Sequence, residues 1–139
     1  MTFSKIISVI LHPIFMPIIA VYLSLSLVPN IGFVIQKYLI FIYLILILST
    51  IILPLMSILF LIKKGVVSSL EIRNYKERSL PIFITILWMI YGYYKISDIL
   101  ILSPVLKSEF LGAIIILFIA SIVSKFWKIS LHMLGIGGV

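Results

Sequence analysis

The stretch that decides the fold of this chain is Tyr38–Ile62, YLIFIYLILILSTIILPLMSILFLI, which contains no charged residue. A helix of about 20 apolar residues crosses the hydrocarbon core of a bilayer. The stretch lacks the alternation of a strand, and only helices or closed barrels satisfy their backbone inside a bilayer. It therefore predicts a membrane-spanning helix, which Pro54 is expected to kink.

Three further apolar runs predict spans near 6–28, 80–95 and 109–125, the last two being short for a bilayer. The segment from Leu131 is apolar and rich in glycine but too short to span, and we interpret it as the start of a fifth helix that has been cut off. We expect a single membrane domain over residues 1–139. Its fold class is all-α: a polytopic membrane helix bundle with four transmembrane helices plus the start of a fifth.

The composition excludes a soluble domain. Apolar residues make up 63% of the chain and charged residues 11%, whereas soluble domains are about half apolar and a quarter charged. The absence of cysteine excludes disulfides, thiolate metal sites and cysteine nucleophiles. The first apolar run is longer than the core of a signal peptide and contains Pro13 and Pro17, so we interpret it as a kinked membrane helix.

The formal net charge is +7, from 11 Lys/Arg against 4 Asp/Glu. The basic residues flank the apolar runs, so membrane lipids with anionic headgroups are the expected partners. We expect no nucleic-acid partner, since there is no basic stripe or exposed aromatic platform; a homo-oligomer stays open. Most cations lie on the N-terminal side, at Lys5, in the loop 63–79, and at Lys125 and Lys128. The positive-inside rule places this side in the cytoplasm.

The connections between the spans are predicted to be a short turn at 29–37, the polar loop at 63–79 and a third loop at 95–109. Within the polar loop, Ser68 and Glu71 have the spacing of a helix capping box. Arg73 and Glu77 have the spacing of an ion pair on one helix face.

Two basic clusters could hold a phosphate at a bilayer surface. Arg78 offers a planar fork for two phosphate oxygens, and Lys76 and Lys128 offer point charges. Ser130 offers a hydroxyl and suits the N-cap of a new helix, which would present free N–H groups to an anion. His132 changes protonation near neutral pH and could protonate a leaving alkoxide.

Each of these residues also has a structural interpretation. Lys76 and Arg78 are typical topology determinants, and Lys125 and Lys128 are typical snorkelling anchors at a helix end. His132 fits an interfacial residue, and His12, beside Pro13, fits a structural element of the first span. Two histidines and four scattered carboxylates show no metal-ligand spacing. We therefore expect no metal and no cofactor.

The segments Lys76–Pro81 (KERSLP) and Trp127–Gly135 (WKISLHMLG) resemble motifs of the small bacterial integral-membrane branch of the type 2 phosphatidic acid phosphatase (PAP2) superfamily. The resemblance spans essentially the whole chain and includes His12-Pro13 and the loop at Ser68. It implies a bundle of about six membrane helices that removes phosphate from lipid phosphates without a metal. It also implies a multi-pass protein of the bacterial cytoplasmic (inner) membrane, although sites in this family commonly face away from the cytoplasm.

On this resemblance, Lys76 and Arg78 bind phosphate, Ser130 binds phosphate and His132 protonates the leaving group. The family's third motif, with an Arg and the nucleophilic His, is absent from this sequence. We therefore expect the N-terminal part of a PAP2-like phosphatase, incomplete and inactive as an enzyme in this form. The alternative is a non-catalytic integral membrane protein that binds a lipid phosphate or a partner helix bundle.

Overall fold

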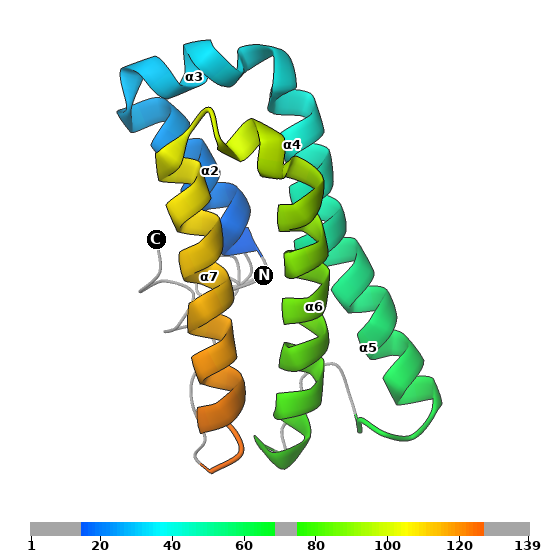
Figure 1. Cartoon of the computed structure of the whole chain (residues 1–139). Helices are drawn as coiled ribbons and strands as arrows, with labels where there is room; N and C mark the ends of the chain where they lie inside the picture. Colours follow the sequence, from blue (N-terminus) through cyan, green and yellow to red (C-terminus); the bar gives the residue numbers. More distant parts are fainter. Residues whose placement is uncertain (1–14, 69–74, 127–139) are drawn as a thin grey trace, which may run out of the picture.

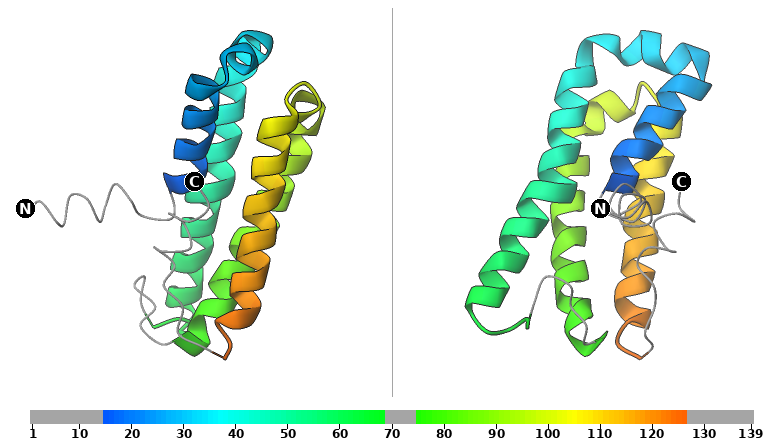
Figure 2. Two further views of the ribbon diagram at one scale, coloured as in Figure 1. Left: turned by 90° about the vertical axis from the view of Figure 1, so that its left-hand side faces the viewer. Right: turned by 180° about the vertical axis from the view of Figure 1, so that it is seen from behind.

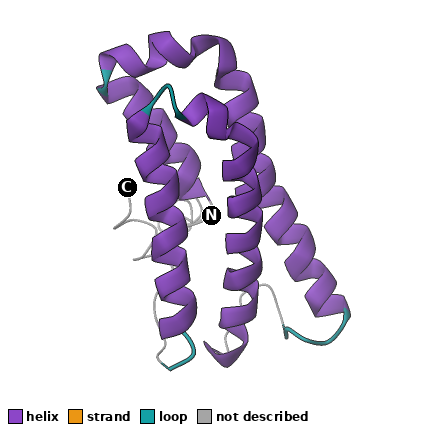
Figure 3. Ribbon diagram, viewed as in Figure 1, coloured by secondary structure: helices purple, strands orange, loops and turns teal. Residues whose placement is uncertain are grey.

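The computed structural model of the chain describes residues 15–68 and 75–126. Within these ranges every regular element is a helix and no strand occurs (Figure 3). The elements are α2 (Met16–Leu27), α3 (Pro29–Ile35), η2 (Gln36–Tyr38), α4 (Leu39–Ile47), η3 (Leu48–Ile52), α5 (Leu53–Lys63), α6 (Tyr75–Leu100) and α7 (Pro104–Val123). The expected all-α fold is confirmed for this part of the chain.

Three helical stretches in the described part are long and apolar enough to cross a membrane: Gly32–Lys63, Ser79–Leu100 and Pro104–Val123. They correspond to the second, third and fourth predicted spans. Of the first predicted span, near 6–28, the structure describes α2, which is shorter than a membrane crossing. The partial helix expected from Leu131 lies outside the described residues.

The helices run up and down in two layers (Figure 1, Figure 2). One layer holds α2 and the continuous α4–η3–α5 rod, and the other holds α6 and α7. The short helix α3 crosses one end of the bundle and joins α2 to η2. The ends of α5 and α7 and the start of α6 all lie at the other end.

Prolines explain where several helices begin. Pro17, Pro29, Pro54 and Pro104 each lie at one of the first two positions of a helix, where the missing N–H costs no hydrogen bond. The disturbance expected at Pro54 takes the form of η3, a π-helical segment that widens the rod just before the proline. Pro17 starts α2, and Pro13 lies outside the described residues.

Three predicted boundaries are wrong. The turn expected at 29–37 is helical, as α3 and η2, because Pro29 starts a new helix after the extended residue Val28. The loop expected at 95–109 shrinks to residues 101–103. Helix α6 continues to Leu100, and Ser103 caps α7 by accepting a hydrogen bond from the backbone N–H of Leu106 at 3.4 Å. Helix α6 also begins at Tyr75, which leaves Pro81 buried inside it rather than in its first turn.

The apolar core lies between α2, α4, α6 and α7. Its fully buried members are Val21, Ile35, Ile42, Leu46, Met89, Ile96, Leu100, Leu106 and Phe110. Large apolar side chains also cover the outside of the bundle: Phe33 is 84% exposed, Ile40 79% and Tyr22 62%. Apolar surface on this scale is expected of helices that face lipid.

Candidate functional site: the basic end of the bundle

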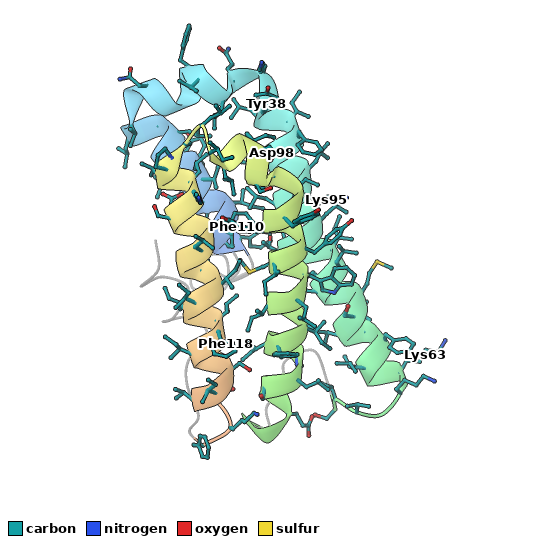
Figure 4. The ribbon with its side chains drawn as sticks, viewed as in Figure 1. Tyr38, Lys63, Lys95, Asp98, Phe110 and Phe118 are labelled. Atoms are coloured by element: carbon teal, nitrogen blue, oxygen red, sulfur yellow. The ribbon has the colours of Figure 1, made fainter. Side chains whose placement is uncertain are left out.

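Basic residues gather where α5 ends, α6 begins and α7 ends. We call this part of the molecule the basic end. Lys63 and Lys64 close α5, Lys76 and Arg78 belong to the first turn of α6, and Lys125 follows α7. The side chains of Lys63, Lys64 and Lys125 are exposed, and Figure 4 shows Lys63 extending from the tip of α5. Cations that flank membrane spans generally attract anionic lipid headgroups.

Helices α6 and α7 meet at the basic end through serine hydroxyls. The Oγ atoms of Ser79 and Ser121 lie 3.4 Å apart, and Ser121 Oγ donates to the backbone carbonyl of Ser79 at 3.3 Å. One turn further along, buried Ser124 donates to the carbonyl of Ser121 at 3.1 Å. These contacts hold Ser79, the neighbour of Arg78, against Ser121, which lies four residues before Lys125.

One carboxylate lies among these cations. Glu77, in the first turn of α6, accepts hydrogen bonds from both the backbone N–H and the hydroxyl of Ser68, each at 2.9 Å. Its position agrees with the preference of acidic side chains for a helix N-terminus. Ser68 thus binds Glu77, whereas Glu71 and Arg73, which the sequence paired with Ser68 and Glu77, lie outside the described residues. The contact ties the end of the α5 loop to the start of α6.

The opposite end of the bundle, made of α3, η2 and residues 101–103, is different in charge. Its charged residues are Lys37, Lys95, Asp98, Lys107 and Glu109, a mixture of signs. Two of its lysines lie over aromatic rings, with Lys37 Nζ 4.7 Å from the Tyr38 centroid and Lys95 Nζ 5.4 Å from that of Tyr91. Figure 4 shows Tyr38, Lys95 and Asp98 toward this end, far from Lys63.

The structure places only some of the predicted site residues. Lys76 and Arg78 were predicted to lie in the loop 63–79, but they belong to the first turn of α6, at the basic end. Lys128, Ser130 and His132 lie outside the described residues, as does His12. The end of α7 lies beside the start of α6, which contains Lys76 and Arg78. The described residues end at 126, shortly before Lys128.

Besides the Ser79–Ser121 contact, sequence reasoning missed two further polar contacts between helices. Glu109, expected to bracket a span, belongs to α7, and one of its oxygens, Oε1, accepts a hydrogen bond from Ser24 of α2. Its other oxygen, Oε2, is buried and has no partner among the described residues. Trp88 of α6 donates from Nε1 to Ser57 of α5 at 2.9 Å. Serines within apolar runs were the signal in both cases, because such hydroxyls bind across helices in membranes.

Among the residues that the structure describes, no group of three His, Cys, Asp or Glu side chains could hold a metal ion. At the basic end the described residues include exposed cations, serine hydroxyls and the carboxylate of Glu77, which is bonded to Ser68. No family model, curated protein or solved structure matches this chain.

Proposed function

We propose that this chain is an integral membrane protein of the PAP2 type that holds the phosphate of a lipid at its basic end. The observation that carries the proposal is the Ser79–Ser121 contact, which brings the start of α6, with Lys76 and Arg78, beside the end of α7, with Lys125. A phosphate needs charge-assisted donors from fixed positions. Two helix ends held together offer such positions, whereas cations on separate loops do not.

The remaining parts of the proposal concern residues beyond the described ones. Residues 6–28 form a fourth span of which α2 is the C-terminal part, and the segment from Leu131 begins a fifth. Lys128 and Ser130 add phosphate ligands, and His132 protonates the leaving alkoxide in the hydrolytic form of the proposal. The positive charge at the basic end favours its placement in the cytoplasm, at a bacterial inner membrane.

Binding and hydrolysis are separated by a titration and an assay on the same protein. The 139-residue chain, purified in a neutral detergent, is titrated with short-chain phosphatidate and with short-chain phosphatidylcholine. We expect phosphatidate to bind at least about tenfold more tightly, since charge-assisted hydrogen bonds contribute more than neutral ones. Arg78→Ala should remove most of this preference, whereas the matched control Lys107→Ala, at the opposite end, should leave it unchanged.

Release of inorganic phosphate from phosphatidate is then followed with a chelator present. Because the sequence contains no nucleophilic motif beside Arg78, we expect binding without turnover. Steady phosphate release that His132→Ala abolishes would instead establish the hydrolytic form. Equal affinity for the two lipids, or equal losses in Arg78→Ala and Lys107→Ala, would overturn the proposal.

A further inference from the structure

The serine contact between α6 and α7 has features that close packing alone does not require. Ser121 is 5% exposed, and its hydroxyl contacts both the hydroxyl and the backbone carbonyl of Ser79. Ser124, fully buried, is bonded in turn to the carbonyl of Ser121. Burying a hydroxyl is unfavourable unless it is hydrogen-bonded, and here the hydroxyls are bonded between the two helices, as serines in membrane bundles commonly are.

These hydroxyls lie where the chain passes from apolar span to basic end. Ser79 follows Arg78 directly and opens the membrane-length part of α6, whereas Ser121 lies in the last turn of α7. Exposed Lys125 follows one turn later. The contact therefore sets the position of the first turn of α6 relative to the end of α7.

We propose that Ser79 and Ser121 are positioning residues of the phosphate site, which hold the first turn of α6, the turn that contains Arg78, beside the end of α7, which Lys125 follows. The proposal rests on the proposed function, because it assigns a role in lipid-phosphate binding. Neither serine touches the phosphate. Each acts through Arg78 and Lys125, whose separation would vary if the two helix ends slid past one another.

Pre-organisation of this kind changes affinity for the phosphate more than it changes the fold. Ser121→Ala removes both hydroxyl contacts with Ser79, and we expect phosphatidate affinity to fall about threefold to tenfold, the usual scale of one or two hydrogen bonds. Ser121→Thr keeps a hydroxyl and should restore most of the affinity. The control Ser108→Ala removes an exposed serine of the same helix, which donates to the carbonyl of Val105 in its own turn, and should have no effect.

A double-mutant cycle separates positioning from general packing. In an Arg78→Ala background, Ser121→Ala should weaken phosphatidate binding by less than twofold, because the cation through which it acts is gone. A loss of equal size in both backgrounds would overturn the proposal. So would a Ser121→Ala protein that unfolds at a lower temperature but binds phosphatidate like the wild type.

The absence of cysteine from the sequence permits a direct test of the contact. The double variant Ser79→Cys/Ser121→Cys should oxidise to a single disulfide, since the two Oγ atoms are 3.4 Å apart and a small shift reaches sulfur–sulfur bonding distance. We expect the oxidised form to bind phosphatidate more tightly than its reduced form. Failure to cross-link, or equal affinity in the two forms, would overturn the positioning role.

The same measurements distinguish the two proposals. If the wild type shows no preference for phosphatidate, the proposed function fails whether or not the cysteines cross-link. If the wild type binds and Arg78→Ala weakens binding, while Ser121→Ala binds like the wild type, the proposed function stands and only the positioning role falls.

Discussion

The two ends of this bundle are formed by the same helices but are stabilised in different ways. The fully buried core gathers toward the opposite end, because its members come from the start of α4, the end of α6 and the start of α7, such as Ile42, Leu100 and Leu106. At the basic end Ile82 and Ile86 of α6 are also buried, and α6 and α7 contact one another through the hydroxyls of Ser79 and Ser121. The larger apolar cluster therefore lies toward one end, and a serine contact lies beside the exposed cations of the other.

This difference teaches where function and stability reside. Densely packed apolar contacts resist movement, whereas sites that bind ligands are drawn from the less tightly packed parts of a structure. The opposite end is closed by α3 and by a short connection at residues 101–103, and it carries charges of both signs. The basic end carries nearly uniform positive charge, which suits an anionic ligand but contributes little to holding the helices together.

The largest expected effect is a difference between the two ends in labelling by a reagent that cannot cross membranes. The variants Lys107→Cys and Lys125→Cys each place one thiol at an exposed position, at the start and just after the end of α7. In intact bacterial spheroplasts we expect an impermeant maleimide to label Lys107→Cys almost completely and Lys125→Cys hardly at all, since basic ends stay in the cytoplasm.

Permeabilising the membrane should then make Lys125→Cys as reactive as Lys107→Cys, which controls for local accessibility. If both thiols react in sealed cells, the two ends of α7 lie on the same side of the membrane and α7 does not cross it. If only Lys125→Cys reacts, α7 crosses the membrane but the basic end faces outward.

The next largest effect is expected at the close contact between α6 and η3. A Cβ atom added to buried Gly92 would lie 2.6 Å from the Oγ and 2.7 Å from the Cβ of Ser49. Gly92→Ala should therefore lower the free energy of unfolding by about 1–3 kcal/mol, as overpacking usually does. The matched control Gly112→Ala has open space around its new methyl group and should be neutral or stabilising by up to about 1 kcal/mol.

Unfolding in mixed detergent micelles, followed by circular dichroism, measures both changes. Ser49→Gly should recover part of the stability lost in Gly92→Ala, because it removes the atoms that the methyl group meets. The folded fraction of Gly92→Ala should keep its preference for phosphatidate, since Gly92 lies far from the basic end. A lost preference with the fold intact would mean that the two ends do not act separately.

The sequence predicted the fold class and most of the helices, because length and apolarity alone identify spans such as Tyr38–Ile62. Boundaries were less predictable. Residues 29–37 were predicted as a turn, although Pro29 starts a helix. Residues 95–109 were predicted as a loop, although α6 continues to Leu100 and α7 begins at Pro104. Charged side chains near helix ends reach the interface without ending the helix.

The roles of the candidate site's cations stay predictions, and the contacts around them were not predicted. Lys76 and Arg78 were proposed from residue type and spacing, and the structure gives their place in the first turn of α6. The Ser79–Ser121 contact was not, because it joins residues 42 positions apart and depends on how α6 and α7 are aligned. A serine in an apolar run indicates a polar contact, but the sequence alone does not identify the partner.

The smallest expected effect concerns the polar contact at the opposite end, between Ser24 of α2 and Glu109 of α7. Ser24→Ala removes the partner of Oε1 while Oε2 is already buried without a partner in the described part of the chain. We expect the free energy of unfolding to fall by about 0.6 kcal/mol, the average for interhelical hydrogen bonds in a membrane bundle, and by no more than about 1.7 kcal/mol. Ser26→Ala is the control, because that exposed hydroxyl donates to the carbonyl of Tyr22 in its own helix.

A second variant tests whether the stability of the opposite end depends on the Ser24–Glu109 contact. Glu109→Leu replaces the whole carboxyl by an apolar group, and replacing both partners of a buried polar pair is often nearly neutral. We expect Ser24→Ala/Glu109→Leu to be more stable than Ser24→Ala alone, because the buried oxygens are gone and apolar packing already dominates at this end. A double variant less stable than either single one would show that the opposite end, like the basic end, depends on its polar contact, and the contrast between the two ends would then rest on charge alone.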